Sequence, residues 1–166
     1  MDDIVIHENE KNEIFDTLEK FIVSRLGYSS RRKHVWILSD KDNSLTARFH
    51  GYRNDLHINF GDCSYLMPNR KCIVIIRIAF REIKHGNGTY LINELCKFAK
   101  KYDYDFIEVQ QPNVACKKFM KKLGFTTTTY LEIGELFSAI QKYQFNKTIS
   151  LIEKMPDKQK RHILSS

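Results

Sequence analysis

The chain has 166 residues, of which 42% are hydrophobic and 12% aromatic, so it is long enough for one domain with an ordinary core and too short for two. No apolar run approaches the roughly 18 residues of a membrane-spanning helix, and the opening MDDIVIHENEKNE lacks the basic and apolar segments of a signal peptide. We therefore expect a cytoplasmic protein without a membrane partner. The four cysteines and six histidines lack zinc-ligand spacing, so we expect reduced thiols and no metal site.

The net charge of +7 is concentrated in the second half of the chain. Residues 1–30 hold seven acids and three bases, whereas the residues from Asn113 onward hold ten bases and four acids. A basic excess favours anionic partners, nucleic acids included. Lysines on helix surfaces also keep proteins soluble without binding a partner, so the charge alone does not favour a nucleic-acid function.

The first half of the chain predicts one helix and three strands. Apolar residues recur at helical spacing over 10–26, with acids early, bases late and Gly27 as the stop. Short β-like runs follow at 34–39, 45–51 and 56–60, separated by the turn residues DKDN and YRND. We expect these runs to pair as antiparallel strands.

The segment from Cys72 to Tyr102 changes character in its middle. Ile73 to Phe80 is an almost unbroken apolar and β-branched run, typical of a buried strand, and 91–99 carries the apolar stripe of a packed helix. A second apolar strand is predicted at 106–109. Together these elements predict a parallel strand pair joined by a right-handed helical crossover.

The last third predicts a short helix, a strand and a longer helix. Ala115, Phe119 and Leu123 repeat at helical spacing before Gly124, 125–134 is rich in β-formers, and 135–154 is amphipathic. No repeat or linker divides the chain. We expect one domain over 1–155 and a basic, solvated and partly disordered tail over 156–166.

The residues KHGNGT, 84–89, lie where the buried strand ends and the helix begins. Ligands of parallel units bind beyond the carboxyl ends of the strands, and a helix N-terminus offers free N–H groups and a positive dipole end. Gly86 and Gly88 would let this backbone approach a phosphate closely. An Asn-Gly hairpin is an alternative that the helical period of 91–99 argues against, whereas a purely steric need for glycine stays open.

The segments GNGTYLINELCKFA and NVACKKFMKKLGF carry two motifs. Together they resemble the GNAT superfamily of acetyl-CoA-dependent N-acetyltransferases over about residues 72–126, and the spacing from Asn113 to Gly124 and Phe125 matches the family's later motif residue for residue. The resemblance implies an α+β fold with a mixed sheet, in which antiparallel N-terminal strands precede a central parallel strand–helix–strand unit and flanking helices. It also implies acetyl-CoA as the cosubstrate.

The resemblance assigns the contacts of acetyl-CoA. The loop backbone would clasp the pyrophosphate, and the end of the preceding strand would pair with the pantetheine arm, which an asparagine after the second strand also contacts. These cofactor-binding residues are Ile78, Ala79, Phe80, Lys84, His85, Gly86, Asn87, Gly88, Thr89 and Asn113.

Three positions depart from the family's pattern. Ile83 stands where the family has Gln or Arg, so one side-chain contribution to the phosphate site is missing. Met120 replaces the tyrosine that protonates the leaving thiolate in many members. Cys116 replaces an alanine, and we expect it to be a packed thiol facing Met120 rather than a covalent acyl carrier.

Acetyl transfer also needs a base that leaves the amine neutral. Cys72 stands where the family's protein-lysine branch carries a glutamate, and cysteine is a poor substitute. The remaining candidates are Glu82, Glu108 and Tyr130, each with a structural alternative: loop surface for Glu82, an exposed strand face for Glu108, and a half-buried strand position for Tyr130.

We therefore predict an N-acetyltransferase that moves an acetyl group from acetyl-CoA to an amine, a macromolecular one if the basic second half takes part. The alternative is a GNAT-fold module that has lost catalysis and binds a nucleic acid or a protein. Met120 and Ile83 favour the alternative, whereas Gly86, Gly88 and Asn113 favour the enzyme.

Overall fold

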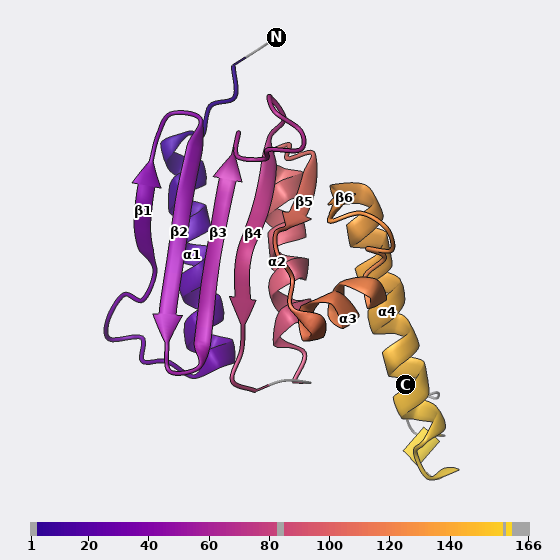
Figure 1. Cartoon of the computed structure of the whole chain (residues 1–166). Coiled ribbons are helices and arrows are strands. Elements are labelled where there is room, and N and C mark those ends of the chain that lie inside the picture. The colour runs from indigo at the N-terminus through magenta and orange to yellow at the C-terminus, as the bar shows by residue number, and fades with distance from the viewer. Residues whose placement is uncertain (1–2, 83–84, 158, 161–166) are drawn as a thin grey trace.

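The computed structural model describes residues 3–82, 85–157 and 159–160, which form one mixed sheet with helices on both of its faces (Figure 1). In chain order its elements are α1 (Glu8–Leu26), β1 (Trp36–Asp40), β2 (Ser44–Gly51), β3 (Asn54–Gly61), β4 (Cys72–Ala79), α2 (Asn87–Lys101), β5 (Phe106–Val109), α3 (Val114–Lys122), β6 (Tyr130–Glu132) and α4 (Ile133–Glu153). The fold class is α+β, as predicted. Of the predicted tail, Lys158 and residues 161–166 lie outside the described residues.

The strands follow one another across the sheet in chain order, from β1 to β6. All neighbouring pairs are antiparallel except β4 and β5, which are parallel and joined through α2. The predicted antiparallel strands and the predicted parallel crossover are therefore confirmed. Because β4 runs toward α2, the end of β4 and the start of α2 lie at the same end of the molecule.

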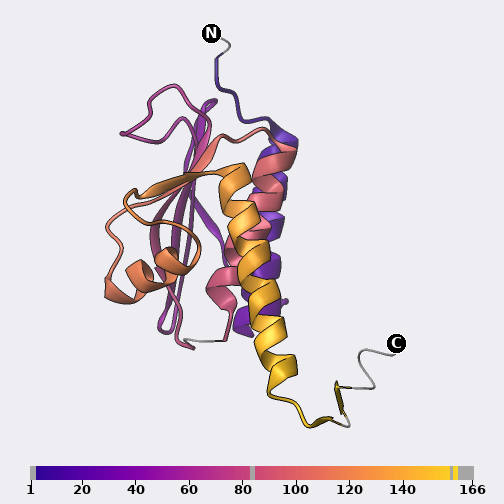
Figure 2. The same ribbon diagram turned by 90° about the vertical axis from the view of Figure 1, so that its right-hand side faces the viewer.

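The helices cover the two faces of the sheet unequally. α1, α2 and α4 lie on one face, whereas α3 lies on the other (Figure 2). The main core fills the space under the three helices, where Phe21 of α1, Ile58 and Phe60 of β3, and Leu91 and Leu95 of α2 are buried. Among the described residues, no helix combines the length and the apolar character that crossing a bilayer requires.

A smaller apolar cluster lies on the other face of β4 and β5. Its buried members are Cys72, Val74 and Phe106, and Tyr130 packs against them. Cys63, in the connection between β3 and β4, places its Sγ 3.5 Å from Cys72 Sγ, and both are free thiols. The β3–β4 connection therefore covers part of this face.

Two predicted elements need correction. The predicted strand over 125–134 shortens to Tyr130–Glu132, because α4 begins directly at Ile133. In α3, Ala115 is exposed, and the buried residue is Met120, which is 5% exposed. Of the predicted apolar repeat, Phe119 packs against the main core and Leu123 is buried, so the predicted packed face is confirmed except at Ala115.

Candidate functional site

The distinctive feature of β4 is an edge that β5 leaves unpaired. The two strands pair until Ile75 meets Val109, and a last bond joins Gln110 N to Ile75 O at 2.9 Å. β4 continues beside β3 to Ala79, whereas the chain after Gln110 turns away into α3. Beyond Ile75, no described strand pairs with this edge of β4. Unpaired strand edges bind extended ligands as an added strand.

A β-bulge interrupts the opposite edge of β4 at the same level. Ile58 pairs with Ile75 and His57 pairs with Arg77, so Ile76 is an extra residue between two rungs of the β3–β4 ladder. Bulges redirect the backbone groups of a strand and are frequent beside active sites. In this sheet the bulge lies where β5 leaves β4.

The predicted arm-binding residues Ile78, Ala79 and Phe80 lie at the end of this unpaired edge. Ile78 and Phe80 pack against the main core, and the Phe80 ring centroid lies 5.5 Å from that of Phe21. Their backbone groups, rather than these side chains, are the groups that would contact an extended ligand.

α2 begins with an uncapped N-terminus beside the end of β4. Its N-cap, Gly86, has a φ of 77°, and no side chain caps the helix. Tyr90 N donates to Gly86 O at 2.9 Å, and the preceding amides of Asn87, Gly88 and Thr89 make no backbone hydrogen bond to another described residue. Unpaired amides and the positive end of the helix dipole attract an anion.

Two further loop residues, Lys84 and His85, were predicted to contact the cofactor. Lys84 lies outside the described residues. His85 is exposed, and its Nδ1 lies 4.0 Å from Glu82 Oε2. Arg25 of α1 also reaches the loop, where its Nη2 donates to His85 O at 3.0 Å. Sequence reasoning missed Arg25 because it is 60 residues away and has no local motif.

The two glycines of the loop serve different purposes. A Cβ at Gly86 would have Arg25 Nη2 as its nearest neighbour, at 3.9 Å, but the positive φ there disfavours other residues. A Cβ at Gly88 would lie 3.0 Å from Phe119 Cζ of α3. The steric interpretation is therefore confirmed for Gly88, whereas Gly86 has space around it.

Asn113 holds the start of α3. Its Oδ1 accepts a hydrogen bond from Cys116 N at 2.8 Å, as an N-cap side chain does. Asn113 is exposed, so it remains accessible to a ligand. Burial raises the pKa of the Cys116 thiol, which agrees with a packed thiol rather than an activated acyl carrier.

Glu108 is a buried carboxylate, so the interpretation of an exposed strand face is wrong. It lies on β5 one residue before the end of the pairing with β4, and it is 3% exposed. Ser64 Oγ donates to its Oε2 at 2.5 Å, and Gln110 Nε2 donates to its Oε1 at 3.3 Å. Burial separates this carboxylate from water, and the two neutral donors fix the position of its oxygens.

The structure brings two of the three catalytic candidates together. Tyr130 is the direct partner of Glu108 across β5 and β6, and Val74 is the partner of Glu108 on β4. Tyr130 is half-buried, as expected, with its ring centroid 5.7 Å from that of Phe106. Glu82 is 64% exposed and follows Val74 by eight residues, roughly 25 Å along an extended chain. Glu82 therefore does not share a site with Glu108.

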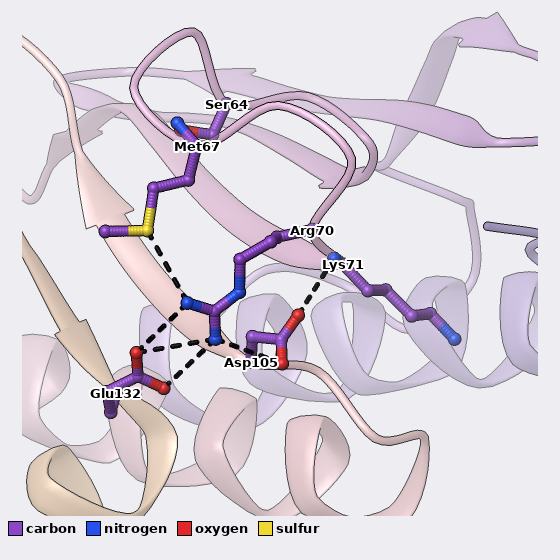
Figure 3. A network of polar contacts seen from close by, with 6 residues as sticks. All are labelled: Ser64, Met67, Arg70, Lys71, Asp105 and Glu132. Atoms are coloured by element: carbon purple, nitrogen blue, oxygen red, sulfur yellow. Dashed lines mark hydrogen bonds and ion pairs between the residues drawn. The ribbon is translucent and has the colours of Figure 1, made fainter. Parts of the chain in front are cut away.

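The connection that carries Ser64 is anchored at its far end by Arg70 (Figure 3). Arg70 Nη2 lies 3.1 Å from Asp105 Oδ1, and Arg70 Nη1 lies 3.4 Å from Glu132 Oε1. Lys71 N also donates to Asp105 Oδ2 at 3.1 Å. These contacts tie the connection to β5 and β6, and thereby hold Ser64 over Glu108.

A scan of the chain against protein-family models finds no match, and a search of curated proteins finds no relative. Within the described residues, no group of three His, Cys, Asp or Glu side chains is arranged to hold a metal ion.

Because Gly88 lies against the Phe119 ring, we predict that the effect of Gly88→Ala on the free energy of unfolding depends on the side chain at position 119. Gly88→Ala should lower the free energy of unfolding by about 1–3 kcal/mol, because the added Cβ is forced against the ring. In a Phe119→Leu background, the same change should raise it by up to about 1 kcal/mol, because alanine favours the helix. Urea unfolding of the four proteins measures both effects.

Gly134→Ala is the matched control, since a Cβ there meets nothing within 4 Å. It should not destabilise the protein in either background. An equal loss of stability for Gly88→Ala with and without Phe119 would contradict the packing role.

Proposed function

We propose that the protein is an acetyl-CoA-dependent N-acetyltransferase. The observation that carries the proposal is the juxtaposition of an unpaired β4 edge, from Ile76 to Ala79, with the uncapped N-terminus of α2 at the end of the same strand. Acetyl-CoA has a pyrophosphate and an extended arm with two amides. The helix N-terminus suits the pyrophosphate, and the strand edge suits the arm. The resemblance of residues 72–126 to the GNAT superfamily supports the same assignment.

The reaction that follows joins the nitrogen of a neutral amine to the thioester carbonyl carbon, and the carbon–sulfur bond then breaks. Backbone N–H groups beside the bulge at Ile76 would polarise the carbonyl oxygen. Glu108 would accept the proton that the amine loses, because it is the buried carboxylate beside the point where β5 leaves β4. Met120 is a core residue without a transferable proton, so the leaving thiolate would take its proton from water.

The phosphate assignment predicts that Gly86→Asp abolishes acetyl-CoA binding. The new carboxylate would stand at the start of α2 and repel the pyrophosphate. The matched control is Gly134→Asp, which also adds a carboxylate at a helix N-terminus, in the first turn of α4, with open space around it. Calorimetric titration should show parent-like affinity for Gly134→Asp and none for a Gly86→Asp protein that remains folded by circular dichroism. Parent-like binding by Gly86→Asp would refute the phosphate site.

The assignment of the base predicts that Glu108→Gln lowers kcat by about 100-fold or more, as expected for loss of a general base. The dissociation constant for acetyl-CoA should stay within about twofold, because Glu108 lies away from the loop. Glu82→Gln is the control and should keep parent kcat, since Glu82 is exposed and distant. The rate is measured as the release of the free thiol from acetyl-CoA. An active Glu108→Gln protein, or an inactive Glu82→Gln protein, would show that Glu108 is not the general base.

A second candidate function is nucleic-acid binding, which one observation favours: Lys117, Lys118, Lys121 and Lys122 are all exposed on α3. If these lysines contact phosphates, affinity for RNA or DNA falls steeply with salt, and replacing Lys118, Lys121 and Lys122 by Gln lowers the salt slope by roughly one unit per lost contact. We expect instead no retention of nucleic acid near physiological salt. Salt-sensitive binding without a response to acetyl-CoA would reverse the choice of function.

A further inference from the structure

The smaller apolar cluster contains a pair of thiols that the proposed acetyl transfer does not use. Cys63 Sγ lies 3.5 Å from Cys72 Sγ, and both sulfurs lie beside the same carbonyl, Gly61 O, at 3.6 Å and 3.3 Å. Among the described residues, no other two cysteine sulfurs are in hydrogen-bond contact. The fold therefore brings together two of the four thiols of the chain and leaves the other two apart.

The backbone at Gly61 places Cys63 beside Cys72. Gly61 is the partner of Cys72 in the β3–β4 ladder, and its φ of 97° changes the direction of the chain at the end of β3. Residues other than glycine rarely adopt this φ, and a Cβ here would also lie 2.2 Å from Asn43 O. Cys63 follows this turn by two residues, so its side chain packs against the cluster that contains Cys72. The contact between the thiols is thus a product of the turn that ends β3.

The two thiols differ in their exposure to solvent. Cys72 is 0% exposed, whereas Cys63 is half-buried, so a small molecule reaches the pair from the side of Cys63. The hydrogen bond from the Cys63 thiol lowers the pKa of Cys72, while burial raises the pKa of Cys96 to about 12 and also raises that of Cys116. Oxidants react with thiolates rather than with thiols. The pair is therefore the part of the chain best suited to cysteine oxidation.

We infer that Cys63 and Cys72 form a dithiol site that a hydroperoxide oxidises to a disulfide. The thiolate of the pair attacks one oxygen of the hydroperoxide and becomes a sulfenic acid, and the other oxygen leaves as hydroxide or alkoxide. That anion takes the proton of the second thiol. The second sulfur then attacks the sulfenic acid, so the S–S bond forms and hydroxide leaves. The two sulfurs are thereby oxidised, and the O–O bond of the hydroperoxide is reduced.

The disulfide acts on the neighbouring Glu108, and this regulatory effect rests on the proposed acetyl transfer. Ser64, whose hydroxyl donates to Glu108 Oε2 at 2.5 Å, follows Cys63 directly. A disulfide needs sulfur atoms about 2.05 Å apart, so the two sulfurs must approach each other by roughly 1.5 Å. Cys72 is held in the sheet between β3 and β5, hence the movement falls on the β3–β4 connection. Oxidation therefore displaces Ser64 from Glu108 and slows acetyl transfer.

The test treats the full chain with hydrogen peroxide, alkylates the remaining thiols after denaturation, and identifies the tryptic peptides by mass spectrometry. Trypsin cleaves after Arg70 and Lys71, so the two thiols of the pair fall in separate peptides, 54–70 and 72–77. The oxidised protein should yield these peptides as one species joined by a disulfide, with the other two thiols alkylated. A reductant should restore four alkylated thiols.

Two variants and a control test the identity of the pair. Cys63→Ser and Cys72→Ala each remove one sulfur, so neither protein should form the linked species. Cys116→Ser removes a thiol outside the pair and should form the linked species as fully as the parent does. Four free thiols in the parent after treatment with excess peroxide would overturn the dithiol site. Linkage of two other cysteines, or oxidation of Cys63 to a sulfinic acid without linkage, would overturn it as well.

Acetyl transfer by the same proteins, measured after the peroxide is removed by gel filtration, separates the two proposals. The oxidised parent should lose roughly 10-fold or more in kcat, as expected when a catalytic group is displaced, and should regain it with the reductant. Cys63→Ser should keep its kcat after the same treatment. Linked peptides with unchanged kcat would overturn the effect on Glu108. Linked peptides in a protein that transfers no acetyl group in either state would keep the dithiol site and overturn the transferase.

Discussion

β4 is paired with β3 along its whole length, but with β5 only from Cys72 to Ile75, and this unequal pairing determines where a ligand can meet the sheet. The bulge at Ile76 lies where β5 separates from β4. β4 therefore bends at the same position at which its pairing with β5 ends. Everything assigned to function lies around that point: the unpaired edge leads to the start of α2, and Glu108 lies on the last rungs of the ladder.

α3 links the end of β5 to the start of α2. It follows β5 on the face opposite to the other helices (Figure 2). The Phe119 ring nevertheless lies against Gly88, in the first turn of α2. Met120 beside it is buried in the core. Met120, which the resemblance aligns with the family's tyrosine, is therefore a packing residue. The close approach of Phe119 to Gly88 also fixes the helix N-terminus that the phosphate assignment needs.

Strong local periodicity made most of the fold predictable. α1, β4, α2 and β5 were predicted from apolar patterns that depend on neighbours in the sequence alone. In α3 the same pattern predicted the packing of Phe119 and Leu123 correctly, whereas Ala115 has the right spacing but is exposed. The burial of Glu108 could not be predicted from the sequence, because Ser64, whose hydroxyl donates to this carboxylate, lies 44 residues away in an irregular connection. Arg25 joins the loop through a similarly distant contact.

The most direct measurement of the central claim is a titration of ¹⁵N-labelled protein with acetyl-CoA, followed through the backbone amide resonances. The account predicts the largest changes at Asn87, Gly88 and Thr89, from the pyrophosphate, and along Ile76–Ala79, from the extended arm. The exposed lysine face of α3 should change little. No response to acetyl-CoA, or changes confined to that lysine face, would contradict the account.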